Sequence, residues 1–187
     1  MRTALIALTI LLLPAALIAS PGPSIGIYFA GGSGMVYSPT QWEEFSGYVL
    51  LNGYECYVNA AEFAISVPAG IDYLSYTLPE GAIALGDPEG GIAISFWPPL
   101  NGFDGSSHLL LTLNFLARKG CGAPTGLSDA PLAVVPDLNA VPVPAVLVNC
   151  FPDNDAHIIP GLTSIICPQE IAVESRSWGA IKSLYEK

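Results

Sequence analysis

The chain has 187 residues, a length typical of one domain with short flanking segments. Acidic residues outnumber Lys and Arg by 16 to 6, which gives a formal net charge of -10 at pH 7. Because nucleic-acid affinity comes mainly from clustered Lys and Arg, this balance excludes a nucleic-acid partner. Only 12% of the residues are charged, whereas Gly (19) and Pro (17) are abundant, and this composition favours short strands separated by turns.

The N-terminus has the layout of a secretory signal peptide. Arg2 precedes an apolar run from Ala4 to Ile18, which is short for a membrane span and ends in small residues. We therefore predict a signal helix over residues 1–19, no membrane span after its removal, and a mature protein that is extracellular or at the cell surface. A retained anchor is the alternative, because Leu17 is not the small residue expected three positions before a cleavage after Ala19.

Three strands are predicted in the first part of the mature chain. They are Ile25–Phe29, Gly47–Leu51 and Tyr54–Val67, with residues 38–44 as a connection. Within the third strand the apolar positions change parity between Val58 and Phe63. A change of one residue in phase is typical of a β-bulge or of a strand that passes between sheets.

Turn signals divide the next region into three further strands, which are Ile71–Leu78, Ala82–Leu85 and Ile92–Trp97. Proline fixes one backbone dihedral and glycine allows positive φ, so the Pro and Gly clusters between these segments predict turns. We expect Pro98 and Pro99 to end the third segment and a Gly-rich loop to follow over residues 100–107.

The stretch from Leu109 to Ala117 is predicted to be the central strand. Its odd-numbered positions are all apolar, while Thr112 and Asn114 occupy even positions. Alternate side chains of a strand point to opposite faces, so this pattern predicts one buried face and one wetter face.

The later part of the chain is rich in proline. Proline lacks the backbone donor that an interior strand uses, so Leu132–Val135 and Val141–Val148 are predicted as edge strands or extended segments. Ile158–Cys167 is a candidate last strand. Strands at this spacing, without a helical period between them, predict one all-β domain over residues 25–168, an antiparallel β-sandwich.

The C-terminal tail, residues 169–187, has a different pattern. Four apolar side chains recur at helical spacing and would form one stripe of a short helix: Trp178, Ile181, Leu184 and Tyr185. So short a helix is unstable alone in water. The tail is therefore expected to dock on its own domain, to contact a partner as a recognition tag, or to stay disordered.

The mature chain keeps four cysteines, which are Cys56, Cys121, Cys150 and Cys167. An even number of cysteines in an exported protein predicts two disulfides, with three possible pairings among which the sequence does not choose. Zinc binding is the competing interpretation. No two of these cysteines have the close spacing of a zinc knuckle, and neither His108 nor His157 is placed to complete a site.

The sequence predicts no catalytic site. Only His108 and His157 would titrate near neutral pH without a large pKa shift, and the serines before His108 lack a glycine-flanked nucleophile pattern. The adjacent Glu43 and Glu44 are typical of a solvated loop, not of two carboxyls that face each other across a glycosidic bond. We therefore predict a protein that is not an enzyme and has no cofactor.

Asp153 and Asp155 are the candidate calcium ligands, because hard cations bind clustered oxygen atoms. Ser164 stands where the last glutamate of an EF-hand loop would be. We therefore favour a solvated turn, in which such side chains bond their own backbone, and predict no metal site.

A binding role remains, either to an extracellular protein, which we favour, or to a polysaccharide. In the polysaccharide alternative, flat rings would stack on sugars, and the candidate rings are Trp42, Tyr54, Trp97 and Phe103. A coplanar, exposed row of rings would favour a glycan partner. A smooth apolar sheet face without such a row would favour a protein partner.

Four segments together resemble the strand pattern of bacterial cohesins, whose sandwich fold is shared by several carbohydrate-binding modules: Gly47–Asn52, Ala61–Ile71, Gly91–Phe96 and Leu109–Phe115. In that pattern an inner strand ends at a Pro-Ala-Gly-Ile turn, and a Leu-x-Leu-x-Phe strand closes the core. The resemblance implies a nine-stranded, cohesin-like jelly-roll sandwich that binds protein or glycan through an exposed face. The ending Ser177–Tyr185 is similar to tails of secreted proteins from environmental bacteria.

Overall fold

The structure is a computed structural model that describes residues 22–29, 34–122, 126–139, 146–152 and 155–168. The predicted signal helix, the C-terminal tail, Asp153 and the first part of Val141–Val148 lie outside these residues. No helix within the described ranges is long and apolar enough to cross a membrane.

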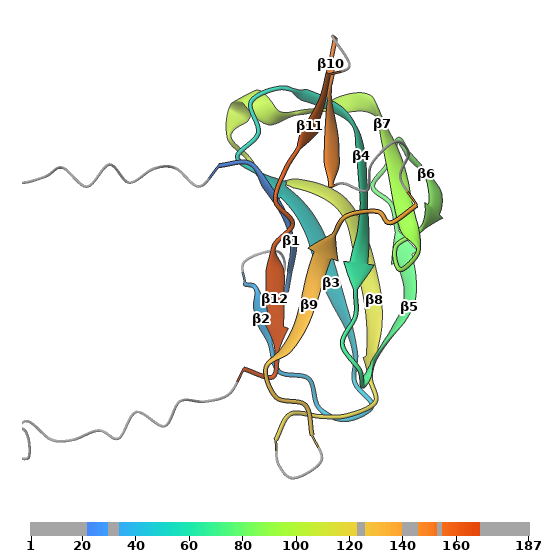
Figure 1. Cartoon of the computed structure of the whole chain (residues 1–187), viewed down its shortest axis with the longest axis vertical. Coiled ribbons are helices and arrows are strands. Elements are labelled where there is room, and N and C mark those ends of the chain that lie inside the picture. The colour runs from blue at the N-terminus through green and yellow to red at the C-terminus, as the bar shows by residue number, and fades with distance from the viewer. Residues whose placement is uncertain (1–21, 30–33, 123–125, 140–145, 153–154, 169–187) are drawn as a thin grey trace, which may run out of the picture.

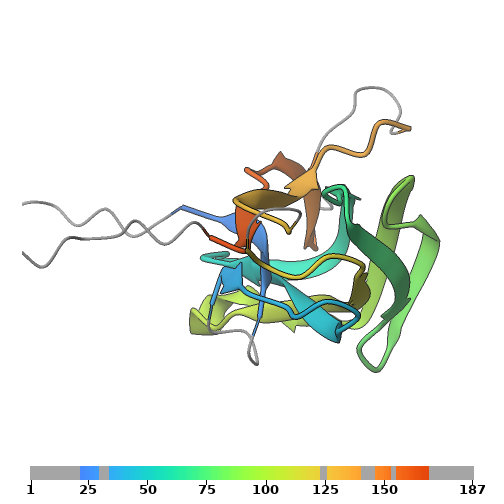
Figure 2. The ribbon, with the colours of Figure 1, turned by 90° about the horizontal axis from the view of Figure 1, so that it is seen from below.

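Two β-sheets pack face to face, as the view from below makes plain (Figure 2). The smaller sheet has four antiparallel strands in the spatial order β1, β3, β8 and β5 (Figure 1). Their bounds are β1 (Ser24–Tyr28), β3 (Glu44–Asn52), β8 (His108–Ala117) and β5 (Ile71–Thr77). Figure 1 shows this sheet behind the larger one.

The larger sheet is organised around one long strand, β4 (Tyr57–Ser66). One side of β4 pairs with β7 (Gly91–Asn101), which in turn pairs with β6 (Ala82–Asp87). The remaining strands continue from the other side of β4: β10 (Leu147–Phe151), β11 (Asp155–Ile158), β9 (Ala130–Val135), β12 (Thr163–Ile166) and β2 (Val36–Tyr37). The pairing of β12 with β2 is parallel, and the other strand pairs are antiparallel.

This architecture confirms the predicted all-β sandwich. The described residues contain twelve strands instead of the nine that the cohesin resemblance implies, because several, such as β2 and β12, are short pairings at the borders.

The central strand β8 is confirmed, with one change near its start. Leu111, Leu113 and Phe115 are fully buried between the sheets. Leu110 is also fully buried, whereas Leu109 is only half-buried. The register explains the change, because Val49 pairs with Leu111 and Leu50 with Leu109, so that Leu110 is an unpaired bulge residue.

The predicted bulge in β4 is confirmed at Asn59. Val58 and Ala60 pair with consecutive residues of β10, and the same two residues frame a shift in the register with β7. The extra residue changes which side chains point inward. Val58 faces the core before the bulge, and the odd-numbered Ala61 and Phe63 face it after the bulge.

Pro98 and Pro99 do not end β7, contrary to the prediction. The strand continues to Asn101, and Leu100 pairs with Val58 of β4. Ser95 pairs with Ala60, so residues 96–99 bulge out of the ladder with β4. The prolines lie in this irregular stretch, where no backbone donor is needed.

The two proline-rich segments were predicted as edge strands or extended segments, but their described parts belong to strands inside the larger sheet. β9 lies between β4 and β12, and β10 lies between β4 and β11. Pro131 lies opposite Ile165 of β12, in the half of β9 that β4 does not reach. Its missing N–H is therefore not required by β4. The predicted last strand is likewise divided into β11 and β12, with Pro160 and Gly161 between them.

The structure contains the two predicted disulfides and selects one of the three pairings. Cys56 bonds to Cys150, which joins the start of β4 to β10 beside the bulge. Cys121 bonds to Cys167, which joins the residues that follow β8 and β12.

Candidate functional site

The exposed side of the larger sheet carries two rows of outward side chains that cross β6, β7, β4, β10 and β11. The strand registers align one row as Ile83, Ser95, Ala60, Asn149 and Ala156. They align the second row as Leu85, Ala93, Glu62, Leu147 and Ile158. We call these ten residues the outer face.

The outer face is low in the middle and raised at its borders. Alanines occupy the centre, and a shallow trough of about 180 Å³ there is lined by Ala60, Ala61, Glu62, Ala93, Leu147 and Asn149. The large side chains at the borders are well exposed, at 79% for Leu85 and 78% for Ile158. Seven of the ten outer-face residues are apolar, and exposed apolar clusters of this kind are common at interaction sites.

Two polar groups in the trough are partly removed from water. The Oδ1 atom of Asn149 is buried and accepts no hydrogen bond from the described residues. Burial raises the pKa of the Glu62 carboxyl above its ordinary value, and the negative charge of Asp137 raises it further. Both groups would gain from a hydrogen-bond donor placed in the trough.

Glu62→Gln is expected to raise the melting temperature slightly at neutral pH. The pKa of Glu62 is higher in the folded than in the unfolded protein, so the ionised carboxylate lowers the stability of the folded state. The gain should vanish below the ordinary glutamate pKa of about 4.3, where the carboxyl is protonated in both states. Thermal unfolding at neutral pH and at about pH 3.5 measures this.

The control for this prediction is Glu44→Gln, at an exposed carboxylate at the start of β3 in the smaller sheet. A Glu62→Gln protein that melts below the wild type at neutral pH would show that the carboxylate stabilises the fold, contrary to our expectation.

The aromatic rings proposed for sugar stacking do not form one row. Trp97 is 77% exposed and continues the outward series of Ala93 and Ser95 on β7. Trp42 donates its backbone N–H to Ala117 at the end of β8, whereas Phe103 precedes the start of β8 and packs edge-on against Tyr57. Trp42 and Phe103 therefore lie at opposite ends of the sandwich.

Tyr54 does not belong with the exposed rings. It is only 6% exposed, its ring meets that of His157 edge-on, and burial raises the pKa of its hydroxyl to about 12. Its ring faces are taken up by the core, so no face is free to stack on a sugar.

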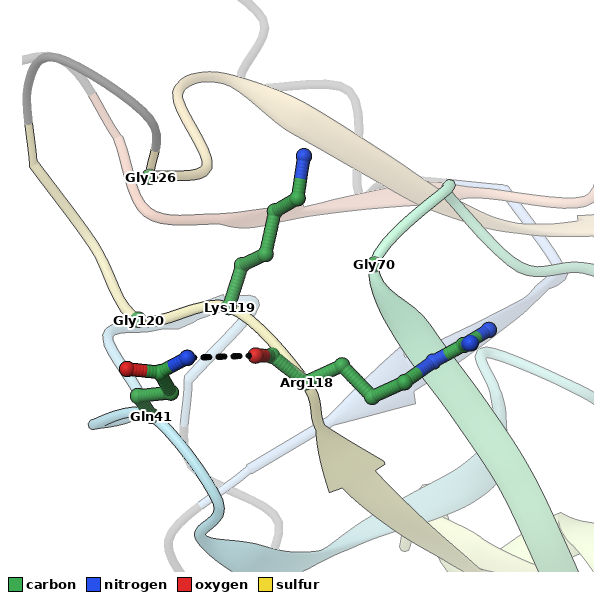
Figure 3. Close-up of a pocket in the computed structure, with 6 residues that line it drawn as sticks. All are labelled: Gln41, Gly70, Arg118, Lys119, Gly120 and Gly126. Carbon is green, nitrogen blue, oxygen red and sulfur yellow. Dashed lines mark hydrogen bonds between the residues drawn. The ribbon is translucent and has the colours of Figure 1, made fainter.

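A larger pocket of about 450 Å³ lies at the end of the sandwich near Gly70 and Gly120 (Figure 3). Its two cations diverge: Arg118 forms an ion pair with Asp72 at 2.6 Å, while Lys119 points to the other side of the chain. Gln41 donates a hydrogen bond to the carbonyl oxygen of Arg118 at 3.1 Å. The rest of the lining is glycine, so its charged groups do not converge on one ligand.

Glu43, one of the carboxyls considered for catalysis, is fixed by hydrogen bonds to its neighbours. Glu43 accepts hydrogen bonds from the Tyr37 hydroxyl at 2.7 Å and from the backbone and side chain of Thr40. These bonds, that of Tyr37 first, lower the pKa of Glu43, the opposite of what a general acid requires. In the described ranges, no three His, Cys, Asp or Glu side chains gather to hold a metal ion, and Asp155 lies exposed on β11.

Comparison with known proteins adds a structural likeness. No protein-family model matches the chain, and no curated protein sequence does. The sixth cohesin of scaffoldin B from Acetivibrio cellulolyticus, solved in complex with a Cel5 dockerin, superposes with a TM-score of 0.52 at 12% identity. That match covers 80% of this chain and 100% of the cohesin.

Two further cohesins give similar values. The third ScaB cohesin of R. flavefaciens, in complex with a group 1 dockerin, has a TM-score of 0.52 at 12% identity over 81% of this chain and 98% of its own. The cohesin CaCohA2 from Clostridium acetobutylicum has a TM-score of 0.51 at 13% identity over 81% and 93%. The chain therefore has a cohesin-like β-sandwich fold, as its strand pattern indicates.

Proposed function

We propose that the protein is a non-catalytic binding module that holds a protein partner against its outer face, outside the cell or at the cell surface. The observation that carries this proposal is the largely apolar surface across five strands, with a trough of small residues between raised borders. Cohesins with a similar fold were solved in complexes with dockerins, which supports a protein partner. The two disulfides support an oxidising compartment.

The chemistry of the outer face favours a partner with apolar and basic groups. Glu62 is its one charged residue, and Asp137 lies near enough to shift the Glu62 pKa. The described part of the chain has basic side chains at Arg118 and Lys119, which lie at the distant pocket near Gly70. A cationic partner group in the trough would therefore meet no basic side chain of the described residues there.

A polysaccharide partner is the less supported alternative. Sugar-binding surfaces use flat, exposed rings, but the candidate rings are spread over both ends of the sandwich and Tyr54 is buried. Trp97 follows Ser95 of the outer face on β7, while Phe103 packs edge-on against Tyr57 at the start of β4.

An Ala93→Arg substitution tests the proposal, because it places a large cation in the trough without burying it. Binders are first selected on the wild-type protein from a display library of secreted-protein fragments of the source organism. We expect their affinity, measured by calorimetry, to fall at least about 30-fold on Ala93→Arg, the loss of about one hot-spot contact.

The matched control is Thr77→Arg, at an exposed position of β5 in the smaller sheet, which should leave affinity unchanged. Binders that tolerate Ala93→Arg would contradict the proposal. Retention on cellulose, xylan or chitin that is lost on Trp97→Ala would favour the polysaccharide alternative instead.

A further inference from the structure

β6 is an edge strand of the larger sheet. It pairs with β7 on one side, and no other described strand pairs with it on the other side. Figures 1 and 2 show the hairpin of β6 and β7 at one lateral border of the molecule. A free edge offers backbone donors and acceptors to another extended chain.

The register identifies the backbone groups that face outward. The N–H of Trp97 donates to the carbonyl oxygen of Gly81 at 3.0 Å, and Ala82 pairs with Phe96. Hydrogen-bonded pairs alternate in an antiparallel ladder, so Ile83 and Leu85 exchange bonds with β7. The N–H and C=O groups of Ala84 and Gly86 therefore point away from β7, toward the free edge.

The middle of the free edge of β6 lacks the devices that normally block pairing, and Asp87, the last residue of the strand, carries its one charge. Residues 81–86 contain no charge and no proline, and the exposed side chains Ile83 and Leu85 are apolar, at 75% and 79% exposure. The opposite border strand, β11, is shorter and carries Asp155 and His157. Soluble proteins usually protect long apolar edges with charges, prolines or bulges, so an unprotected edge indicates a binding role.

We propose that β6 binds an extended segment of a partner protein as an additional strand, with alternating apolar residues in the middle and basic residues at both ends. The apolar side chains would lie beside Ile83 and Leu85. The basic ends would meet Glu80 at one end of β6 and Asp87 with Glu89 at the other, so the charges are complementary.

The same charges disfavour a second copy of this chain as the occupant. Antiparallel pairing of two β6 strands about Ala84 would place Asp87 of each copy beside Gly81 and Glu80 of the other. Carboxylates would then face carboxylates at both ends. The strand-binding proposal goes beyond the proposed function: it shares Ile83 and Leu85 with the outer face, but it rests on the free backbone groups of β6 and does not require the trough to bind.

The test uses the mature chain labelled with nitrogen-15 and the synthetic peptide acetyl-Lys-Lys-Val-Ala-Val-Ala-Val-Lys-Lys-amide. We expect saturable changes in the amide signals of Ala84 and Gly86, together with at least tenfold slower hydrogen exchange at both amides, because strand pairing occupies these donors. The same peptide with Glu in place of Lys, or with Pro in place of its central Val, should not bind.

Two lysine substitutions separate the edge from the rest of the surface. Leu85→Lys and, independently, Ile83→Lys should weaken the peptide at least tenfold, while Ile158→Lys on β11, at an equally exposed apolar residue, should not. All three positions are exposed, so folding is retained. Unchanged exchange at Ala84 and Gly86, equal binding of the Glu peptide, or a dimer in sedimentation that protects these amides would overturn the proposal.

Discussion

Removal of the Cys56–Cys150 disulfide by the double substitution Cys56→Ala and Cys150→Ala is expected to lower the melting temperature by about 10 °C. The bond closes a loop with a sequence separation of 94. In the chain-entropy account, a loop near this length destabilises the unfolded chain by about 4–5 kcal/mol, and each kcal/mol shifts the melting temperature of a domain this size by about 2–4 °C. Differential scanning calorimetry of the oxidised proteins measures the shift.

The second disulfide is the internal comparison. Cys121–Cys167 has a separation of 46, and loop entropy varies with the logarithm of loop length. The loss of stability on its removal should therefore differ from the loss on removal of Cys56–Cys150 by no more than about 1 kcal/mol. Melting temperatures that do not change in either double variant would mean that the bonds do not constrain the unfolded chain.

Phe115→Ala is expected to reduce the free energy of unfolding by about 3–5 kcal/mol, the usual loss for a large buried ring. Phe115 lies on the central strand β8 and is fully buried. Its ring stacks on Phe45 at a centroid distance of 5.3 Å and meets Tyr73 edge-on at 6.4 Å. Removing it leaves a cavity between the two sheets that the surrounding strands cannot fill. Urea unfolding measures the difference.

The adjacent substitution Leu116→Ala provides the control, because Leu116 points to the other face of β8 and is only half-buried. It should reduce the free energy of unfolding by about 1 kcal/mol. Equal losses at the two positions would show that the region between the sheets is not the main core.

Much of the fold follows from local patterns in the sequence. Alternation identified β8 and its buried face, and the parity change of β4 located the bulge at Asn59. These signals depend on neighbouring residues alone. Both proline predictions were wrong because they treated every position of a strand as paired on two sides, whereas Pro98, Pro99 and Pro131 lie where one side is irregular or unpaired.

Less of the candidate site could be predicted. The sequence places Ala93, Ser95 and Trp97 on one face of a strand, but it does not say that Leu147 lies beside Glu62. That contact depends on the register between strands that are more than eighty residues apart. The disulfide pairing and the burial of Tyr54 have the same cause, since both depend on which distant strands become neighbours.

The bond between Cys121 and Cys167 also sets how mechanical tension would travel through the molecule. A pull applied to the chain at Pro168 reaches Cys167 and crosses the sulfur bridge to Cys121, four residues after β8. The polypeptide between the two cysteines, which includes β9, β10, β11 and β12, is then largely shielded from stretching. Any load on the tail is thus transferred to β8 in the middle of the smaller sheet, while β10 and β11, the two strands of the outer face that lie between these cysteines, are bypassed.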